Sequence, residues 1–236
     1  MDQSLRLCED GSHTLFSENA GECYHSIHGA YNESVHIFIE AGFRSVLKNV
    51  ETKPADIVLM PDLKVVRILE VGFGTGLNAL LTAIEAEKEQ VLVSYLGLEP
   101  FPVEPEIVQQ LNYCDFLSDN SSLIFKAMHE REWEKSHEVL SGFNFEKRKI
   151  GFMEVQLPDH SFDLIYFDAF SPEAQPDLWE PEVFVKCFRI LAQHGILVTY
   201  CAKGSVKRAL KAAGFVVENL PGPAGKREIT RAHKLI

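Results

Sequence analysis

The sequence predicts an α/β fold with a mostly parallel sheet, covered by helices on both faces and closed by an antiparallel C-terminal hairpin strand. Apolar, strand-like stretches alternate with helical ones from Val65 onward, and such repeated units build parallel sheets. A glycine-rich turn at 72–76 separates the first of these strands from the next helix. The 236 residues, 46% of them hydrophobic, are enough for one sizeable domain.

Each element follows from its local pattern. The stretch 162–167 is apolar almost throughout, as expected of a strand buried on both faces. Gly214 is placed to end a helix, and the turn 221–225, rich in Pro and Gly, is placed to join two antiparallel strands. We expect strands at 65–71, 91–98, 162–167, 195–200, 215–220 and 227–235, and helices at 77–86, 104–111, through 130–132, 182–191 and 205–213.

Residues 1–60 differ in texture from the rest. Residues 16–31 mix aromatic residues and glycines in a strand–turn pattern, and 33–48 carry apolar residues at close to helical spacing. We expect residues 1–60 to form a lid or substrate-entry extension and residues 61–236 to form a Rossmann-like main domain.

Composition excludes several classes of protein. No apolar run approaches the ~20 residues that span a bilayer, and no signal sequence opens the chain. The five cysteines form no C-x-x-C pair, which argues against a disulfide framework and fits a reducing cytoplasm. Cys23, His25, His28 and His36 superficially suggest a metal site. We expect none, because no second group of ligands follows; pocket lining or a surface hairpin is favoured.

The glycine turn is preceded by an acidic residue. Glu70 lies just before Gly72, Gly74 and Gly76, and the G-x-G-x-G spacing differs from the G-x-G-x-x-G of dinucleotide binders. A carboxylate here would repel a pyrophosphate but suits a ligand that carries an ammonium group. Glu99, at the end of the next expected strand, is placed to accept hydrogen bonds from ribose hydroxyls. The alternatives are a purely structural turn and a solvated carboxylate.

A second polar cluster follows the buried strand 162–167. Asp168 is followed by Phe170, Ser171 and Pro172, at the edge where such sheets bind ligands. A carboxylate beside an aromatic ring and a proline can hold an amine in line with a methyl donor. The alternative is that Asp168 caps the following helix.

Charge is unevenly distributed along the chain. The net charge is −11, which is unusual for a protein that binds nucleic acid. The segment from Cys201 onward, however, carries eight basic and two acidic residues, and a second basic cluster occupies 147–149. These are either solvated faces or an edge that contacts phosphates.

Six segments together resemble the MnmC-type tRNA methyltransferases, a family formed by the methyltransferase half of a bifunctional tRNA-modification enzyme and its stand-alone relatives. They are residues 29–38, 72–78, 168–172, 175–179, 199–204 and 221–228. The resemblance spans nearly the whole chain, and the segments after Asp168 are more specific than the glycine turn.

The resemblance implies a class I methyltransferase that uses S-adenosylmethionine to convert the 5-aminomethyl group of wobble uridine in tRNA to 5-methylaminomethyl(-2-thio)uridine. It implies Asp168 as the catalytic residue. The cofactor-binding residues would be Glu70, Gly72, Gly74, Gly76, Asn78, Glu99 and Asp168. The substrate-binding residues would be Tyr31, Glu33, Phe170, Pro172, Lys203, Lys207, Arg208, Lys226 and Arg227.

The chain departs from the family pattern in two ways. The family often has an acidic residue beside adenine, but the corresponding stretch here reads Ile-Gly-Phe-Met-Glu at 150–154, which leaves the adenine contact open, and we expect no flavin-dependent oxidase half. The protein should therefore methylate an existing aminomethyl group, without flavin, metal or membrane. The alternatives are an aminopropyl or other small-amine transferase of the same fold, or a non-catalytic RNA-binding module. A nicotinamide oxidoreductase is disfavoured by the glycine spacing.

Overall fold

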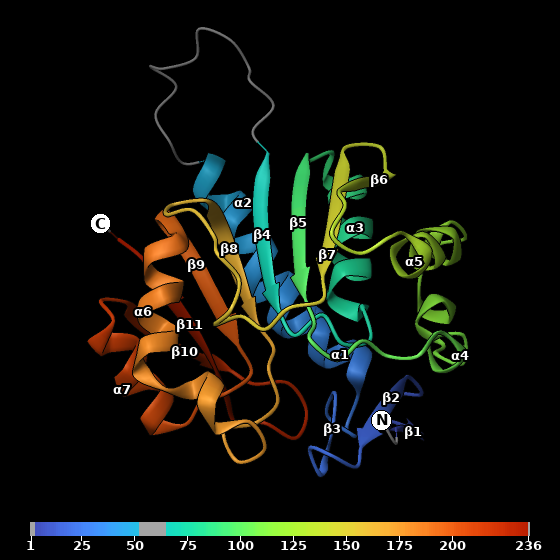
Figure 1. The fold of residues 1–236 in the computed structure, drawn as a ribbon, viewed down its shortest axis with the longest axis horizontal. Coiled ribbons are helices and arrows are strands. Elements are labelled where there is room, and N and C mark those ends of the chain that lie inside the picture. Colours follow the sequence, from blue (N-terminus) through green and yellow to red (C-terminus); the bar gives the residue numbers. More distant parts are fainter. Residues whose placement is uncertain (1–2, 52–64, 236) are drawn as a thin grey trace, which may run out of the picture.

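The structure, a computed structural model, describes residues 3–51 and 65–235 (Figure 1). Its centre is an eight-stranded sheet in the order β10-β11-β9-β8-β4-β5-β7-β6. The five inner strands β9, β8, β4, β5 and β7 run parallel, while β11, β10 and β6 pair antiparallel at the two edges. The predicted fold class is thereby confirmed. The expected boundary between residues 60 and 61 lies outside the described residues.

The strands of this sheet correspond largely to the predicted ones. Six of them lie close to their expected positions: β4 (Val66–Val71), β5 (Val93–Leu98), β8 (Phe162–Phe167), β9 (Leu191–Thr199), β10 (Val216–Pro221) and β11 (Glu228–His233). The remaining two, β6 (His137–Leu140) and β7 (Phe143–Arg148), were not predicted. They form a hairpin whose second strand extends the parallel part of the sheet.

Helices cover both faces of the sheet because its strands alternate their side chains. Ile68, Leu164 and Ile196 belong to one apolar cluster, and their neighbours in the sequence belong to the other. The first cluster includes α3 (Leu77–Glu89) and α5 (Ser121–Glu130). The second includes α6 (Pro181–Ile190) and α7 (Gly204–Ala212). Of the predicted helices, 104–111 shortens to α4 (Pro105–Val108), and the one expected through 132 ends at Glu130.

The N-terminal segment contributes two different parts. A small antiparallel sheet consists of β1 (Gln3–Leu7), β2 (His13–Ser17) and β3 (Glu22–Cys23). A continuous helical stretch follows, made of α1 (Ala30–Ser34), the π-helix η1 (Val35–Phe43) and α2 (Arg44–Glu51).

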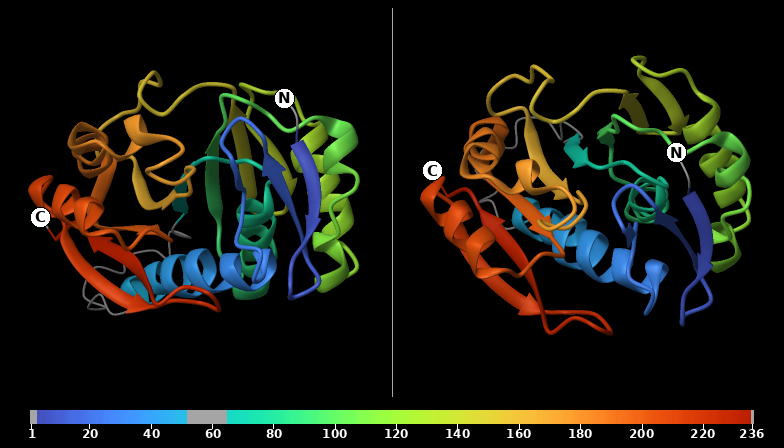
Figure 2. Two further views of the ribbon diagram at one scale, coloured as in Figure 1. Left: turned by 90° about the horizontal axis from the view of Figure 1, so that it is seen from below. Right: turned by 60° about the horizontal axis from the view of Figure 1, so that its bottom comes forward.

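This helical stretch, coloured blue, lies across one face of the main sheet (Figure 2). Phe38 packs on Tyr166 with ring centroids 5.1 Å apart. Gly42 lets the π-helix approach the sheet, since an added Cβ would lie 3.0 Å from Tyr166 and 3.1 Å from Val198. The helical part is therefore built into the core, and β1–β3 lie below the carboxyl ends of β4 and β5 in Figure 1.

Candidate functional site

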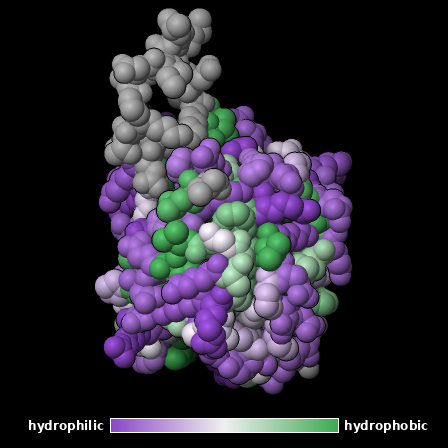
Figure 3. All heavy atoms as spheres, turned by 90° about the vertical axis from the view of Figure 1, so that its left-hand side faces the viewer, coloured by the Kyte–Doolittle hydropathy of each residue, from purple (hydrophilic) through white to green (hydrophobic). Residues whose placement is uncertain are grey.

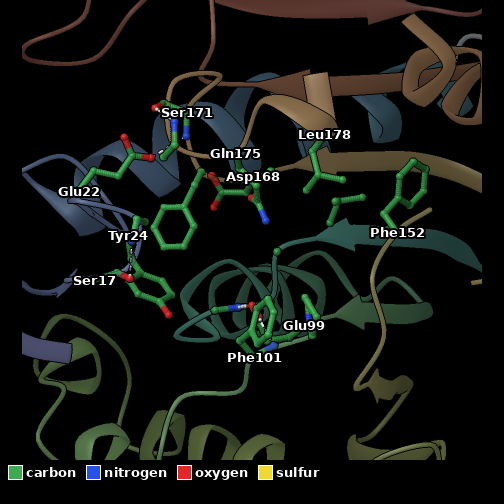
Figure 4. A pocket seen from close by; sticks show the side chains of 18 of the residues that line it. Ser17, Glu22, Tyr24, Glu99, Phe101, Phe152, Asp168, Ser171, Gln175 and Leu178 are labelled. Atoms are coloured by element: carbon green, nitrogen blue, oxygen red, sulfur yellow. Dashed lines mark hydrogen bonds between the residues drawn. The ribbon is translucent and has the colours of Figure 1, made fainter. Parts of the chain in front are cut away.

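A cavity of about 760 Å³ lies at the carboxyl ends of the parallel strands. Residues at the ends of β4, β5 and β8 form its floor, and residues of the small N-terminal sheet form its opposite wall. Segment 150–154 and the loop 168–178 complete it (Figure 4), together with Lys226 from the β10–β11 turn. Open α/β sheets bind their ligands at this edge, as the sequence predicts.

The glycine turn brings backbone close to the cavity. Gly72, Gly74 and Gly76 have φ values of +92°, +49° and +80°, a region that side chains rarely adopt. A Cβ on Gly72 would lie 2.5 Å from the carbonyl oxygen of Asp168, and one on Gly74 would lie 3.0 Å from the ring of Tyr24. Gly72 and Gly74 line the cavity, whereas Gly76 lies behind it at the start of α3. The turn is thus a cradle that any Cβ would fill.

Glu70 lies behind this cradle and does not line the cavity. Its side chain is fully buried and accepts hydrogen bonds from Asn78 Nδ2 at 2.9 Å and from the Tyr95 hydroxyl at 2.8 Å. Burial raises the pKa of Glu70 well above its usual value. Its direct contact with a cofactor stays a prediction.

Asn78 links Glu70 to Asp168. The same Nδ2 group donates to Asp168 Oδ2 at 2.8 Å. Its buried carbonyl oxygen, Oδ1, has no hydrogen-bond partner among residues 3–51 and 65–235. Asn78 does not line the cavity, but an unpaired buried acceptor costs free energy, so a contact between this oxygen and the ammonium group of a ligand stays a prediction.

Glu99 joins two loops at the cavity floor. Its carboxylate accepts hydrogen bonds from the backbone N–H groups of Gly74 and Phe101, both at 2.9 Å. Burial raises the pKa of Glu99 to about 7. Because each carboxylate oxygen can accept a second hydrogen bond, Glu99 retains the capacity for ribose hydroxyls that the sequence predicts.

Asp168 stands at the centre of the cavity wall (Figure 4). Only Oδ2 accepts a side-chain hydrogen bond from the described residues, which leaves Oδ1 available to a ligand. Burial raises the pKa of Asp168 to about 7, and the nearby Glu33 acts in the same direction. Asp168 does not cap the next helix, because the residue at that position is Gln175.

The loop after Asp168 is held in place from several sides. Phe170 packs edge-on against Tyr24 at 4.9 Å between ring centroids. Its carbonyl oxygen accepts a hydrogen bond from Trp179 Nε1 at 2.8 Å, and the Ser171 N–H donates to Glu22 at 2.6 Å. Phe170 lines the cavity as predicted, whereas Pro172 does not. Sequence reasoning missed Glu22 and Tyr24, because no local pattern shows that β3 meets this loop.

The N-terminal residues expected at the substrate divide into two groups. Tyr31 stacks on Phe116 at 5.1 Å between ring centroids and does not line the cavity. Glu33 does line it, is only 6% exposed, and forms an ion pair with Lys226. His25 lines the same end, and burial lowers its pKa to about 4, so this imidazole is neutral near pH 7.

Segment 150–154 forms the wall near Glu99 and Phe101. Phe152 is buried, while Met153 and Phe101 are 44% and 55% exposed. These apolar side chains, with the carboxylate of Glu154, provide a slot with one polar group. The contact of this segment with adenine stays a prediction.

The expected basic edge is partly neutralised by ion pairs. Lys203 pairs with Glu173, Lys207 with Glu228, Lys226 with Glu33 and Arg231 with Glu218. Arg208, Lys211 and Arg227 form no ion pair within the described part of the chain. In the second basic cluster, Lys147 is only 2% exposed, and burial lowers its pKa to about 8. Figure 3 shows the side that carries α6 and α7, with hydrophilic residues around a hydrophobic area.

Neither a metal site nor a membrane-spanning helix occurs in the described part of the chain. Among residues 3–51 and 65–235, no group of three or more His, Cys, Asp or Glu side chains is arranged to hold a metal ion. No helix in the same ranges has the length and apolar character needed to cross a bilayer.

Comparisons with known proteins agree with this geometry. A family model described as S-adenosyl-L-methionine-dependent methyltransferase matches residues 130–235. The bifunctional protein MnmC of Campylobacter hominis, named for tRNA 5-methylaminomethyl-2-thiouridine biosynthesis, is 28% identical over 93% of this chain and 31% of its own length. The protein of the same name from Hydrogenovibrio crunogenus is 31% identical over 69% of this chain. This chain thus spans about a third of the curated relatives that it matches.

Among solved structures, the crystal structure of MNMC2 from Aquifex aeolicus is similar over 100% of this chain and 71% of its own, with a TM-score of 0.74 and 26% identity. Spermidine synthase from Thermotoga maritima is similar at a TM-score of 0.51 and 12% identity. The second likeness concerns the fold alone.

Proposed function

Since this chain is an S-adenosyl-L-methionine-dependent methyltransferase of the MnmC type, we propose that it methylates the 5-aminomethyl nitrogen of the wobble uridine in tRNA. The observation that carries the proposal is the placement of Asp168. This half-buried carboxylate faces the cavity between the glycine cradle and the small N-terminal sheet, with one oxygen unoccupied. A carboxylate at that place suits an amine acceptor.

The residues present fit the cofactor. Gly72 and Gly74 leave room for close approach to backbone, Glu99 can accept from hydroxyls, and Asn78 Oδ1 is a buried acceptor that has no partner within the described part of the chain. When bound, S-adenosylmethionine supplies an electrophilic methyl group. We assign its methionine end to the Asn78 side of the cavity, its ribose to Glu99 and its adenine to the slot formed by segment 150–154.

Asp168 would position the amine and accept its proton. An alkylamine is mostly protonated near pH 7, and only the neutral form has a lone pair for attack. With a pKa raised to about 7, the Asp168 carboxyl can take up a proton at neutral pH, which a carboxyl of ordinary pKa does poorly. Phe170 and Tyr24 form apolar walls beside it and restrict the amine to one approach.

The test is mass analysis of wobble nucleosides after tRNA carrying 5-aminomethyluridine is incubated with the protein and labelled S-adenosylmethionine. We expect one added methyl group on the aminomethyl nitrogen. Asp168→Asn should slow this transfer roughly 10²–10⁴-fold, the range for losing a positioned acid–base group. The control is Asp119→Asn, which changes an exposed carboxylate outside the cavity.

A tRNA that stays unmodified while the cofactor binds would refute the proposal. Near-normal turnover by Asp168→Asn would be compatible with the proposed substrate but would refute the proposed role of Asp168. An aminopropyl transferase would instead modify free amines with the decarboxylated cofactor, which a parallel reaction detects.

We further propose a reducing cytoplasm as the location, supported by five free cysteines.

A further inference from the structure

Glu33 and Lys226 form an ion pair inside the cavity, although they are 193 positions apart in the chain. Glu33 lies on α1 and Lys226 in the turn between β10 and β11. Their side chains are 8% and 27% exposed. Both line the cavity, as Asp168 does, and both charges act on the pKa of Asp168, so the pair lies where the proposed acceptor would bind.

Both members of the pair keep unused hydrogen-bonding capacity. The Glu33 carboxylate accepts from Lys226 and from the Ser26 N–H at 2.7 Å, which is about half of its roughly four lone-pair sites. Lys226 Nζ has three N–H groups. It donates to Glu33 and lies 4.2 Å from the centroid of the Tyr200 ring, and it has no other hydrogen-bond acceptor among the described residues. The Lys226 ammonium group and the Glu33 carboxylate can therefore offer a ligand one hydrogen-bond donor and one acceptor next to each other.

Tyr200 keeps this pair close to the reacting group. Its hydroxyl donates to the carbonyl oxygen of Ala169 at 2.9 Å, the residue directly after Asp168. Its ring supports the Lys226 ammonium group. Movement of the pair relative to Asp168 is limited by this contact, because the same tyrosine touches both sides.

The order of donor and acceptor matches one base edge. Uracil presents the O4 acceptor beside the N3–H donor, whereas cytosine presents an N4 amino donor beside the N3 acceptor. We propose that Lys226 donates to O4 and Glu33 accepts from N3–H of the target base, so that the pair selects uracil and rejects cytosine. This inference rests on the proposed function. Because O4 adjoins the C5 substituent, a base held this way keeps its aminomethyl group at the Asp168 end.

Cytosine should be rejected because its hydrogen-bonding groups would face groups of the same kind on the protein. A cytosine in the same position would set its amino group against the Lys226 ammonium and its N3 against the Glu33 carboxylate. Neither side chain would then find a hydrogen-bond partner on the base, and sites built to hydrogen-bond their ligand discriminate strongly for this reason. We expect a preference of at least ~10²-fold for the uridine substrate.

The alternative is that the pair only fastens the β10–β11 turn to α1. Arg44 and Glu85 provide a matched comparison, because this pair also joins the N-terminal helical stretch to the rest of the fold. Glu85 is 8% exposed, close to the 6% of Glu33, but neither Arg44 nor Glu85 lines the cavity.

The experiment compares two anticodon stem-loops that differ only in the target base, 5-aminomethyluridine or 5-aminomethylcytidine. Single-turnover methyl transfer gives the uridine-to-cytidine rate ratio for wild type, Glu33→Gln, Lys226→Met and the control Glu85→Gln. Because a glutamine amide can turn to accept or to donate, Glu33→Gln should lower the ratio at least ~10-fold. Lys226→Met should slow the uridine reaction without accelerating the cytidine one, and Glu85→Gln should leave the ratio unchanged.

Thermal unfolding and calorimetric S-adenosylmethionine binding establish that each variant is folded. A wild type that methylates both stem-loops at similar rates overturns this inference but not the proposed function. A wild type that binds the cofactor and methylates neither stem-loop refutes the proposed function itself. An unchanged uridine-to-cytidine rate ratio in folded Glu33→Gln also overturns the inference. The comparison of Glu33→Gln with the wild type is therefore a sufficient test even if Lys226→Met does not fold.

Discussion

Replacing Gly72 by alanine should damage stability and catalysis together. Two costs act on the folded state. The residue has φ +92°, and an alanine in the left-handed region costs roughly 1–2 kcal/mol. Its Cβ would also lie 2.5 Å from the carbonyl oxygen and 3.0 Å from the carbonyl carbon of Asp168, and such overpacking costs about 1–3 kcal/mol. The free energy of unfolding should fall by about 2–5 kcal/mol.

Gly11 is the matched control for the first cost alone. Its φ is +83°, and a Cβ there would meet only the ring of Phe116 at 3.8 Å, an ordinary contact. Gly11→Ala should therefore lose about 1–2 kcal/mol. The atoms that must shift in Gly72→Ala belong to the backbone of Asp168, and a displacement of about 1 Å at a reacting group can slow a reaction about 10²-fold.

Urea unfolding of both variants and single-turnover methyl transfer measure the two effects. Equal stability losses in Gly72→Ala and Gly11→Ala would show that the close approach to Asp168 does not exist in solution. Near wild-type transfer by folded Gly72→Ala would show that the position of Asp168 does not depend on this glycine.

Three further predictions concern charge. The kcat/KM for methyl transfer should rise with pH through about 7, because Asp168 has a raised pKa and must lose its proton to act as acceptor; a flat pH–rate profile would contradict this. The pKa of Glu99 is raised to about 7 in the folded protein. The contribution of this carboxyl group to the free energy of unfolding is therefore fully present below its unfolded pKa and is lost as the pH rises through 7. The Tm difference between Glu99→Gln and wild type should therefore shift in favour of the variant from about pH 5 to about pH 8, while S-adenosylmethionine binding weakens in calorimetry. Replacing Arg208 and Arg227 by alanine should weaken tRNA binding and reduce the dependence of log K on log salt concentration by up to about 2. Lys207→Ala should change this slope less, since Glu228 already neutralises that charge. Equal slopes for all variants in filter binding would count against a basic edge.

Local patterns were enough to predict the strand–turn–helix unit around Gly72 and the position of Asp168. Both depend on residues close together in the chain: an apolar run, a turn that requires glycine, and a polar residue at a strand end. The confirmed, mostly parallel character of the sheet follows from the same repeated unit. These features could be predicted because each is decided within a few residues.

Contacts between distant segments could not be predicted in this way. The strand β7 was missed because its alternation of Phe143, Phe145 and Lys147 toward the interior requires a buried lysine. That ammonium group donates to the His129 carbonyl and lies 4.7 Å from the ring centroid of Trp133. The bond between Glu22 and the backbone of Ser171 likewise depends on how β3 meets a loop 149 positions later. No local pattern in the sequence encodes either contact.

The ion pair between Glu33 and Lys226 also has a consequence for the order in which the cavity can assemble during synthesis. The chain leaves the ribosome from its N-terminus, so Glu33 emerges long before its partner. The cradle, Glu99 and Asp168 have all been synthesised by residue 168, whereas Lys226 and the strand that follows it, β11, are made later. A nascent chain could thus assemble the cofactor end of the cavity while its acceptor end still lacks a wall. Recognition of the base would thus be acquired after the cofactor end of the cavity as this protein is made.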